Sequence, residues 1–102
     1  MAIVKTDVPM TYARCEQAIL ELAKKYPFLR TEVLTETAQG RNIRTLVIGN
    51  GARKVIYSAG WHANEWITVP LLLKFVEEFA EALQNGGKIF GVNAGDLAAK
   101  TT

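Results

Sequence analysis

Apolar side chains recur every three or four residues in two stretches of the chain, the spacing of one face of an α-helix. The first stretch begins after Thr11, a suitable helix cap, and ends at Pro27, and its apolar positions are Tyr12, Cys15, Ile19, Leu22 and Tyr26. The second has Pro70 in its first turn and ends at Gly86-Gly87, and its apolar positions are Val69, Leu72, Leu73, Val76, Phe79, Ala80 and Leu83. Thr68 is the expected N-cap of this second helix, although an earlier start with a distortion at Pro70 is also open.

A different pattern separates the two helices. Residues 31–37 and 42–48 are rich in β-branched types, and Gly40 in the linker 38–41 predicts a hairpin turn. Residues 54–59 are almost continuously apolar, which predicts a strand buried on both faces, inside an α/β sheet. Residues 1–10 are expected to be an irregular lead-in, and residues 93–100 a last short helix.

The order helix, β-hairpin, buried strand, helix indicates an α/β fold. Three strands cannot build a sheet in which one of them is covered on both sides, so the strand at 54–59 requires neighbours. We therefore expect residues 11–102 to be the N-terminal portion of a larger, incomplete α/β domain, preceded by the lead-in at 1–10.

Composition narrows the function classes. Apolar residues make up 49% of the chain and charged residues 22%, a balance typical of folded domains. The formal net charge of +2 argues against a nucleic-acid partner, and no apolar run reaches the ~18 residues of a membrane span. One cysteine excludes an internal disulfide. The N-terminus lacks the apolar core of a signal peptide, which favours a cytoplasmic location.

The candidate chemistry lies between the buried strand and the second helix. His62, the only histidine, is followed three residues later by Glu65, and both offer good ligand atoms for zinc. A three-residue step across a strand-to-helix junction can direct both side chains to one point at the carboxyl end of the strand, where open α/β sheets place their sites. The spacing alone leaves a second reading open, a surface histidine and a first-turn glutamate favoured by the helix dipole.

The surrounding residues resemble a known family. Gly40-Arg41 after a strand, the strand Val55 to Ala59, and the run Gly60-Trp61-His62-Ala63-Asn64-Glu65-Trp66-Ile67-Thr68 are similar to the N-terminal part of the zinc carboxypeptidases. The residue sequence of this run, together with Tyr26-Pro27-Phe28-Leu29-Arg30 upstream, is most similar to the bacterial branch of γ-D-glutamyl-diamino acid endopeptidases, which cut peptidoglycan peptides.

The resemblance implies a mixed-sheet α/β/α domain and a zinc-dependent peptidase. It implies that His62 and Glu65 are two Zn²⁺ ligands. It also implies that the substrate is a peptide, such as a peptidoglycan stem peptide. Asn64 stands where digestive carboxypeptidases have a substrate-binding arginine, so it is either a substrate contact or a loop residue that satisfies local backbone.

The same resemblance places the remaining machinery elsewhere. The family's third zinc ligand, catalytic glutamate, carboxylate-binding arginine and tyrosine all lie beyond the equivalent of Thr102. No catalytic residue is therefore expected in this chain, which carries the first zinc motif alone, and we expect the 102 residues by themselves to be inactive.

Two other functions remain open. An N-acyl amino acid deacylase shares the His-x-x-Glu start, although the Trp-Ile-Thr continuation argues against it, and a non-catalytic fragment or interaction module is the alternative outside enzymes.

Other features are expected to have structural roles. Trp61 and Trp66 are expected to pack around the junction, Cys15 to be a buried thiol, and Arg41 to sit at a hairpin tip. Glu77, Glu78 and Glu81 are expected to be a solvated helix face.

Overall fold

The computed structural model describes residues 2–102 and begins with an irregular lead-in that ends at α1, Tyr12–Lys25. The hydroxyl of Thr11 caps α1 by accepting a hydrogen bond from the backbone N–H of Arg14 at 3.2 Å. Lys24 and Lys25 lie in the last turn, where their charge complements the helix dipole. The first predicted helix and its cap are confirmed.

The predicted hairpin is also present. Strands β1, Arg30–Glu36, and β2, Asn42–Val47, pair antiparallel, with Arg30 opposite Val47 and an irregularity between Val33 and Thr35. Gly40 has a φ of +76°, a conformation that a turn here requires and that glycine adopts without steric cost.

The second half of the chain is largely helical. A 3₁₀ turn, η1, covers Ala63–Glu65, and α2 covers Thr68–Gln84 with Pro70 in its first turn. Asn85 and Gly86 end α2. Two short strands, β3 at Lys88–Ile89 and β4 at Val92–Asn93, form a small antiparallel pair before α3, Ala94–Lys100. The side chain of Asn93 caps α3 through the N–H of Asp96, so the predicted last helix is confirmed.

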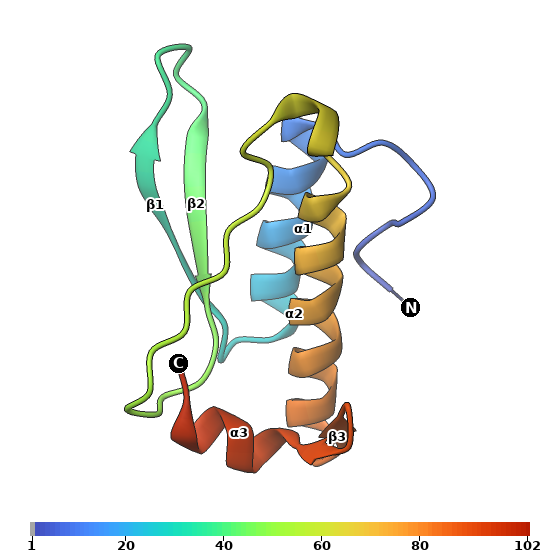
Figure 1. Cartoon of the computed structure of the whole chain (residues 1–102), viewed down its shortest axis with the longest axis vertical. Coiled ribbons are helices and arrows are strands. Elements are labelled where there is room, and N and C mark those ends of the chain that lie inside the picture. The colour runs from blue at the N-terminus through green and yellow to red at the C-terminus, as the bar shows by residue number, and fades with distance from the viewer. Residues whose placement is uncertain (1) are drawn as a thin grey trace.

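The helices lie together beside the hairpin, as Figure 1 shows, with α3 crossing near the end of α2. Leu22 of α1 and Tyr26, the residue that follows α1, pack with Leu29 and with Leu73 and Ala80 of α2, and all of them are buried. Partly buried Leu46 and Ile48 from β2 and the following loop close this core from the hairpin side. The result is a mixed α/β arrangement, as the sequence predicts. None of the helices among residues 2–102 is long and apolar enough to cross a membrane.

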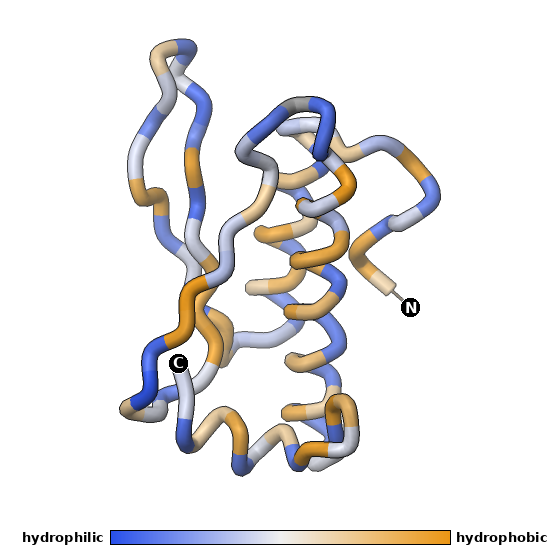
Figure 2. The backbone as a smooth tube through the Cα atoms, viewed as in Figure 1, coloured by the Kyte–Doolittle hydropathy of each residue, from blue (hydrophilic) through white to orange (hydrophobic). Residues whose placement is uncertain are grey.

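The predicted buried strand at 54–59 is wrong for this structure. The chain there is extended but joins no ladder, apart from an isolated parallel bridge between Arg53 and Thr101. Ile56 is 90% exposed, and Figure 2 shows a strongly hydrophobic stretch in the first part of this run. Burial on both faces requires a neighbouring strand and covering helices, and the described residues place neither against Ile56.

The prediction that Glu77 lies on a solvated face is also wrong. Its side chain is 3% exposed and accepts hydrogen bonds from the backbone N–H groups of Ile3 and Val4 at 2.6 and 3.2 Å. Lys74 donates a further hydrogen bond at 3.2 Å. The helix pattern misleads here because the lead-in, which has no periodicity, folds back and covers this part of α2. Glu78 and Glu81 are exposed, as predicted.

Candidate functional site

The site loop, residues 60–68, joins the extended run to α2. Gly60 has a φ of +75°, and a Cβ built on it would lie 2.7 Å from Cγ2 of Val69, so glycine is needed for both reasons. The hydroxyl of Thr68 accepts a hydrogen bond from the N–H of Gly60 and donates one to the carbonyl oxygen of Glu65, each at 2.9 Å. The N-cap of α2 is Ile67, so Thr68 is not the cap that the sequence predicts.

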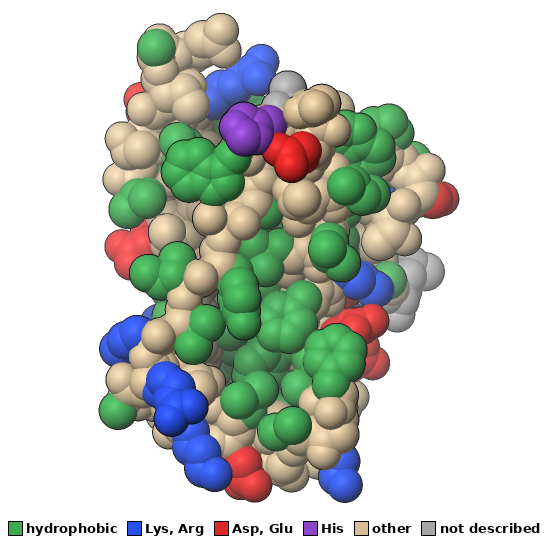
Figure 3. All heavy atoms as spheres, in the orientation of Figure 1, with side chains coloured by type: hydrophobic (Ala, Val, Ile, Leu, Met, Phe, Trp, Pro, Cys, Tyr) green, Lys and Arg blue, Asp and Glu red, His purple; other side chains and the backbone are tan. Residues whose placement is uncertain are grey.

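His62 and Glu65 meet in this loop. Nδ1 of His62 lies 2.6 Å from Oε1 of Glu65, and the backbone N–H of Glu65 donates to the carbonyl of His62 at 2.9 Å. The two side chains are 76% and 54% exposed. In Figure 3 the histidine and an adjacent acidic side chain lie on one open face of the molecule. The structure therefore brings the two residues together, as their spacing predicts, while their role as metal ligands stays a prediction.

The geometry of the pair fits zinc after a small movement. Two ligand atoms bound to a tetrahedral zinc ion at about 2.05 Å lie ~3.3 Å apart. The imidazole nitrogen and the carboxylate oxygen are 2.6 Å apart and form a direct hydrogen bond. If the two atoms moved apart by roughly 0.7 Å, they could bind one zinc ion between them. Both side chains are exposed, so rotation about their side-chain bonds can supply this movement.

The described residues do not form a complete metal site. Across residues 2–102 no group of three or more histidine, cysteine, aspartate or glutamate side chains is placed to hold a metal ion. Stable protein sites for zinc use three or four protein ligands, so this pair by itself would not complete one.

Asn64 lies between the two candidate ligands in η1 and is exposed. Its side chain is therefore open to a ligand, and its role in substrate binding stays a prediction. The expectation that both tryptophans pack around the junction is wrong for Trp61, which is 79% exposed and donates a hydrogen bond from Nε1 to Oγ of Ser58 at 2.8 Å. Trp66 is 38% exposed.

Two further residues have structural roles, as expected. Cys15 is half-buried and free, and burial, with a smaller contribution from the charge of Glu16, raises the pKa of its thiol. A thiol with a raised pKa is a poor nucleophile at neutral pH. The guanidinium of Arg41 lies 5.3 Å from the centre of the Tyr12 ring, which ties the hairpin turn to α1.

The sequence pattern does not reveal the roles of two polar groups that organise the loop, Ser58 and the hydroxyl of Thr68. A threonine just before an apolar helical stretch is the ordinary signal of an N-cap, so the pattern suggested a different bond from the one Thr68 makes. Ser58 carries no signal by itself, because its partner is a tryptophan side chain whose direction depends on the turn at Gly60.

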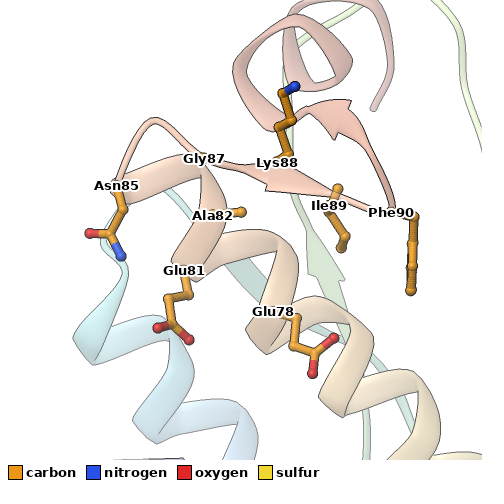
Figure 4. Close-up of a pocket in the computed structure, with 8 residues that line it drawn as sticks. All are labelled: Glu78, Glu81, Ala82, Asn85, Gly87, Lys88, Ile89 and Phe90. Atoms are coloured by element: carbon orange, nitrogen blue, oxygen red, sulfur yellow. The ribbon is translucent and has the colours of Figure 1, made fainter.

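A shallow hollow at the other end of α2 is separate from this pair. Its volume is about 480 Å³, and Figure 4 shows it between the last turns of α2 and β3, lined by Glu78, Glu81, Ala82, Asn85, Gly87, Lys88, Ile89 and Phe90. Glu78 lies ten residues beyond Thr68, about 15 Å along the helix at 1.5 Å per residue. The hollow and the candidate ligands therefore do not form one site.

Known proteins match most of this chain, including the site loop. The family model described as zinc carboxypeptidase matches residues 15–90. The chain is 35% identical over 91 residues to γ-D-glutamyl-L-diamino acid endopeptidase 1 of Lysinibacillus sphaericus, an alignment that covers 89% of this chain and 23% of that protein.

A second relative is the uncharacterized protein YqgT of Bacillus subtilis (strain 168), 33% identical over 78 residues, with 74% of this chain and 21% of that protein covered. The chain thus spans less than a quarter of the length of these two curated relatives. No solved structure matches it.

Proposed function

The chain belongs to the zinc carboxypeptidase family, and we propose that it carries the first zinc-binding element of a peptidase that cuts γ-D-glutamyl-diamino acid bonds in peptidoglycan peptides. The single observation that supports the metal role best is the 2.6 Å approach of His62 Nδ1 to Glu65 Oε1 in an exposed loop. The relative from Lysinibacillus sphaericus, named as an endopeptidase of this specificity, supports the choice of substrate.

In this proposal His62 and Glu65 hold zinc through nitrogen and oxygen, and Asn64 beside them contacts a peptide group of the substrate. Zinc in such a site acts as a Lewis acid towards the scissile carbonyl and makes water a better nucleophile. A third protein ligand and the group that moves the proton come from outside these 102 residues, because the described residues offer no third ligand near the pair.

Zinc binding by the 102-residue chain tests the metal role directly. We expect weak binding, with a dissociation constant above roughly 10 μM, because two protein ligands leave most of the coordination to water. Titration of isotope-labelled protein with Zn²⁺, followed by nuclear magnetic resonance, should shift the signals of His62 and Glu65 first. His62→Ala should abolish these shifts. Glu78→Ala, which removes an exposed carboxylate of α2 far from the loop, is the matched control and should change nothing.

Activity tests the substrate. The 102-residue chain should not hydrolyse a γ-D-glutamyl-diaminopimelate peptide at a measurable rate, whereas a zinc-loaded protein in which this chain is extended to a full-length domain of the family should do so. His62→Ala and Glu65→Ala should each abolish that turnover, and Glu78→Ala should preserve it. Turnover that survives both ligand substitutions would contradict the metal role, and turnover restricted to substrates with a free C-terminal residue would replace the endopeptidase assignment by a carboxypeptidase one.

One observation favours a second candidate function. Ile56 and Tyr57 expose large apolar side chains on the run that leads into the site loop, a feature of surfaces that bind other proteins. A non-catalytic interaction module is therefore the alternative. Absence of peptide hydrolysis from the zinc-loaded, full-length domain, together with His62-independent capture of a partner, would favour it. Hydrolysis of N-acyl amino acids in place of the peptides would instead favour a deacylase.

A further inference from the structure

The site loop is held closed by one side-chain hydroxyl. Thr68 is half-buried at the first position of α2, and its Oγ1 both accepts from the N–H of Gly60 and donates to the carbonyl of Glu65, at 2.9 Å in each case. The bond to Gly60 crosses eight residues of chain. A single oxygen therefore joins the end of the extended run, the end of η1 and the start of α2.

The other hydrogen bonds seen in this loop are local. They join positions three or four residues apart: Glu65 N–H to His62 O, Val69 N–H to Trp66 O, Leu71 N–H to Ile67 O, Trp61 Nε1 to Ser58 Oγ, and the side-chain bond between His62 Nδ1 and Glu65 Oε1. Such bonds shape individual turns but do not set the distance between the two ends of the loop. The Thr68 hydroxyl does so, because its bond to the N–H of Gly60 spans the loop.

The path of the chain places His62 and Glu65 between the two backbone groups that the Thr68 hydroxyl binds. His62 comes two residues after Gly60, and the carbonyl of Glu65 is itself bonded to Thr68, so the hydroxyl fixes the backbone on both sides of the pair. We propose that Thr68 is a positioning residue, whose hydroxyl holds the backbone of residues 60–65 so that His62 and Glu65 converge on one metal ion. This inference rests on the proposed function, and it adds a residue that neither ligates the metal nor contacts the substrate.

Thr68→Val tests the proposal, because valine keeps the shape of threonine and removes both hydrogen bonds. The first readouts need no metal. We expect the amide hydrogen of Gly60 to exchange with solvent at least tenfold faster than in the parent protein, and the nuclear Overhauser contact between the His62 ring and the Glu65 side chain to be lost. Thr68→Ser keeps the hydroxyl and should retain the contact, with Gly60 exchange within about threefold of the parent rate.

Zinc affinity is the second readout. Groups that orient metal ligands typically change affinity 10- to 100-fold when they are removed, so Thr68→Val should bind Zn²⁺ about tenfold more weakly than the parent chain. Thr68→Ser should restore the affinity. Thr101→Val is the matched control, because it removes a threonine hydroxyl that donates to the backbone carbonyl of Leu97 at 2.7 Å, in a part of the chain away from the loop. It should leave zinc affinity unchanged.

The outcomes separate this inference from the proposed function. A parent chain without His62-dependent zinc binding would refute the metal role, and the Gly60 exchange and the His62–Glu65 contact would still decide the positioning role. Retention of that contact in Thr68→Val would overturn the positioning role, and so would a Thr68→Ser variant as impaired as Thr68→Val. Thr68→Ala, which also lacks the hydroxyl, decides the question if Thr68→Val does not fold.

Discussion

The packed core and the extended run with its site loop are built on different principles. In the core, α1 and α2 pack on each other and on the hairpin, and Leu22 and Tyr26 are almost completely buried. The run at 53–60 also carries large apolar residues, yet Ile56 and Tyr57 are exposed, and the loop after it is held by hydrogen bonds of single side chains. Stability in this protein therefore comes from the core, whereas the candidate chemistry lies on the part with little packing.

The largest effect should come from an apolar pair that contrasts the two regions. Leu22 is 0% exposed and Ile56 is 90% exposed. Leu22→Ala should lower the free energy of unfolding by about 3 kcal/mol, through lost burial and the cavity left behind. Ile56→Ala should change it by less than about 0.5 kcal/mol, since almost no buried surface is lost. Urea unfolding of both variants measures the difference, and a loss at Ile56 comparable to that at Leu22 would show that the run is packed in solution.

The second effect concerns Glu77, the buried carboxylate among residues 2–102. Glu77→Gln should cost about 2 kcal/mol, because a neutral amide replaces the charged acceptor of two backbone N–H groups and of Lys74. Glu78→Gln, on the exposed side of α2, is the matched control and should lie within about 0.5 kcal/mol of the parent. Equal effects at both positions would contradict the docking of the lead-in on α2.

The same carboxylate makes stability depend on pH. Burial, the largest single influence, raises the pKa of Glu77, but the N–H groups of Ile3 and Val4 and the ammonium of Lys74 together lower it below its ordinary value of 4.5. A depressed pKa in the folded state stabilises the fold above the ordinary value, and this contribution is lost as pH falls below 4.5 through the folded pKa. Unfolding measured between neutral pH and pH 3 should show this acid loss in the parent and a smaller one in Glu77→Gln.

Elements that depend on local spacing can be predicted from the sequence, whereas long-range contacts cannot. The spacing of Ile19, Leu22 and Tyr26 depends on helix geometry alone, so α1 could be predicted from it, and Gly40 likewise marks the hairpin turn. Glu77 was misassigned because its partners, Ile3 and Val4, lie more than 70 residues away in a segment without periodicity. Long-range contacts of this kind leave no local pattern.

The extended run and the site loop also contain features that the sequence predicts and features that it does not. An apolar stretch such as 54–59 indicates a residue type suited to burial, but burial itself depends on neighbouring strands, which the described residues do not place there. The approach of His62 to Glu65 could be anticipated from their three-residue spacing at a turn. The bond from Thr68 back to Gly60 could not, because it depends on the positive φ of Gly60 and on the path of the whole loop.

The third effect tests the path of the site loop with two glycines. Gly60 and Gly86 both have positive φ, but an added Cβ would approach Val69 Cγ2 to 2.7 Å at Gly60 and would meet nothing within 4 Å at Gly86. Gly86→Ala should cost about 1 kcal/mol from backbone strain, and Gly60→Ala about 1.5 kcal/mol because of the additional contact. The double variant Gly60→Ala/Val69→Ala should recover the excess in a thermodynamic cycle. No recovery would show that Val69 does not limit the loop.

The smallest effect concerns the hydrogen bond from Trp61 Nε1 to Ser58 Oγ, 2.8 Å long and exposed. Ser58→Ala should lower the free energy of unfolding by less than about 0.5 kcal/mol, because water replaces the lost acceptor. The indole should nevertheless become more mobile, which the fluorescence anisotropy of Trp61 measures once Trp66 is replaced by phenylalanine. Ser58→Thr keeps the hydroxyl and is the control. A large stability loss in Ser58→Ala would mean that the extended run contributes to the core after all, whereas greater mobility at nearly constant stability would show that local side-chain bonds order the run.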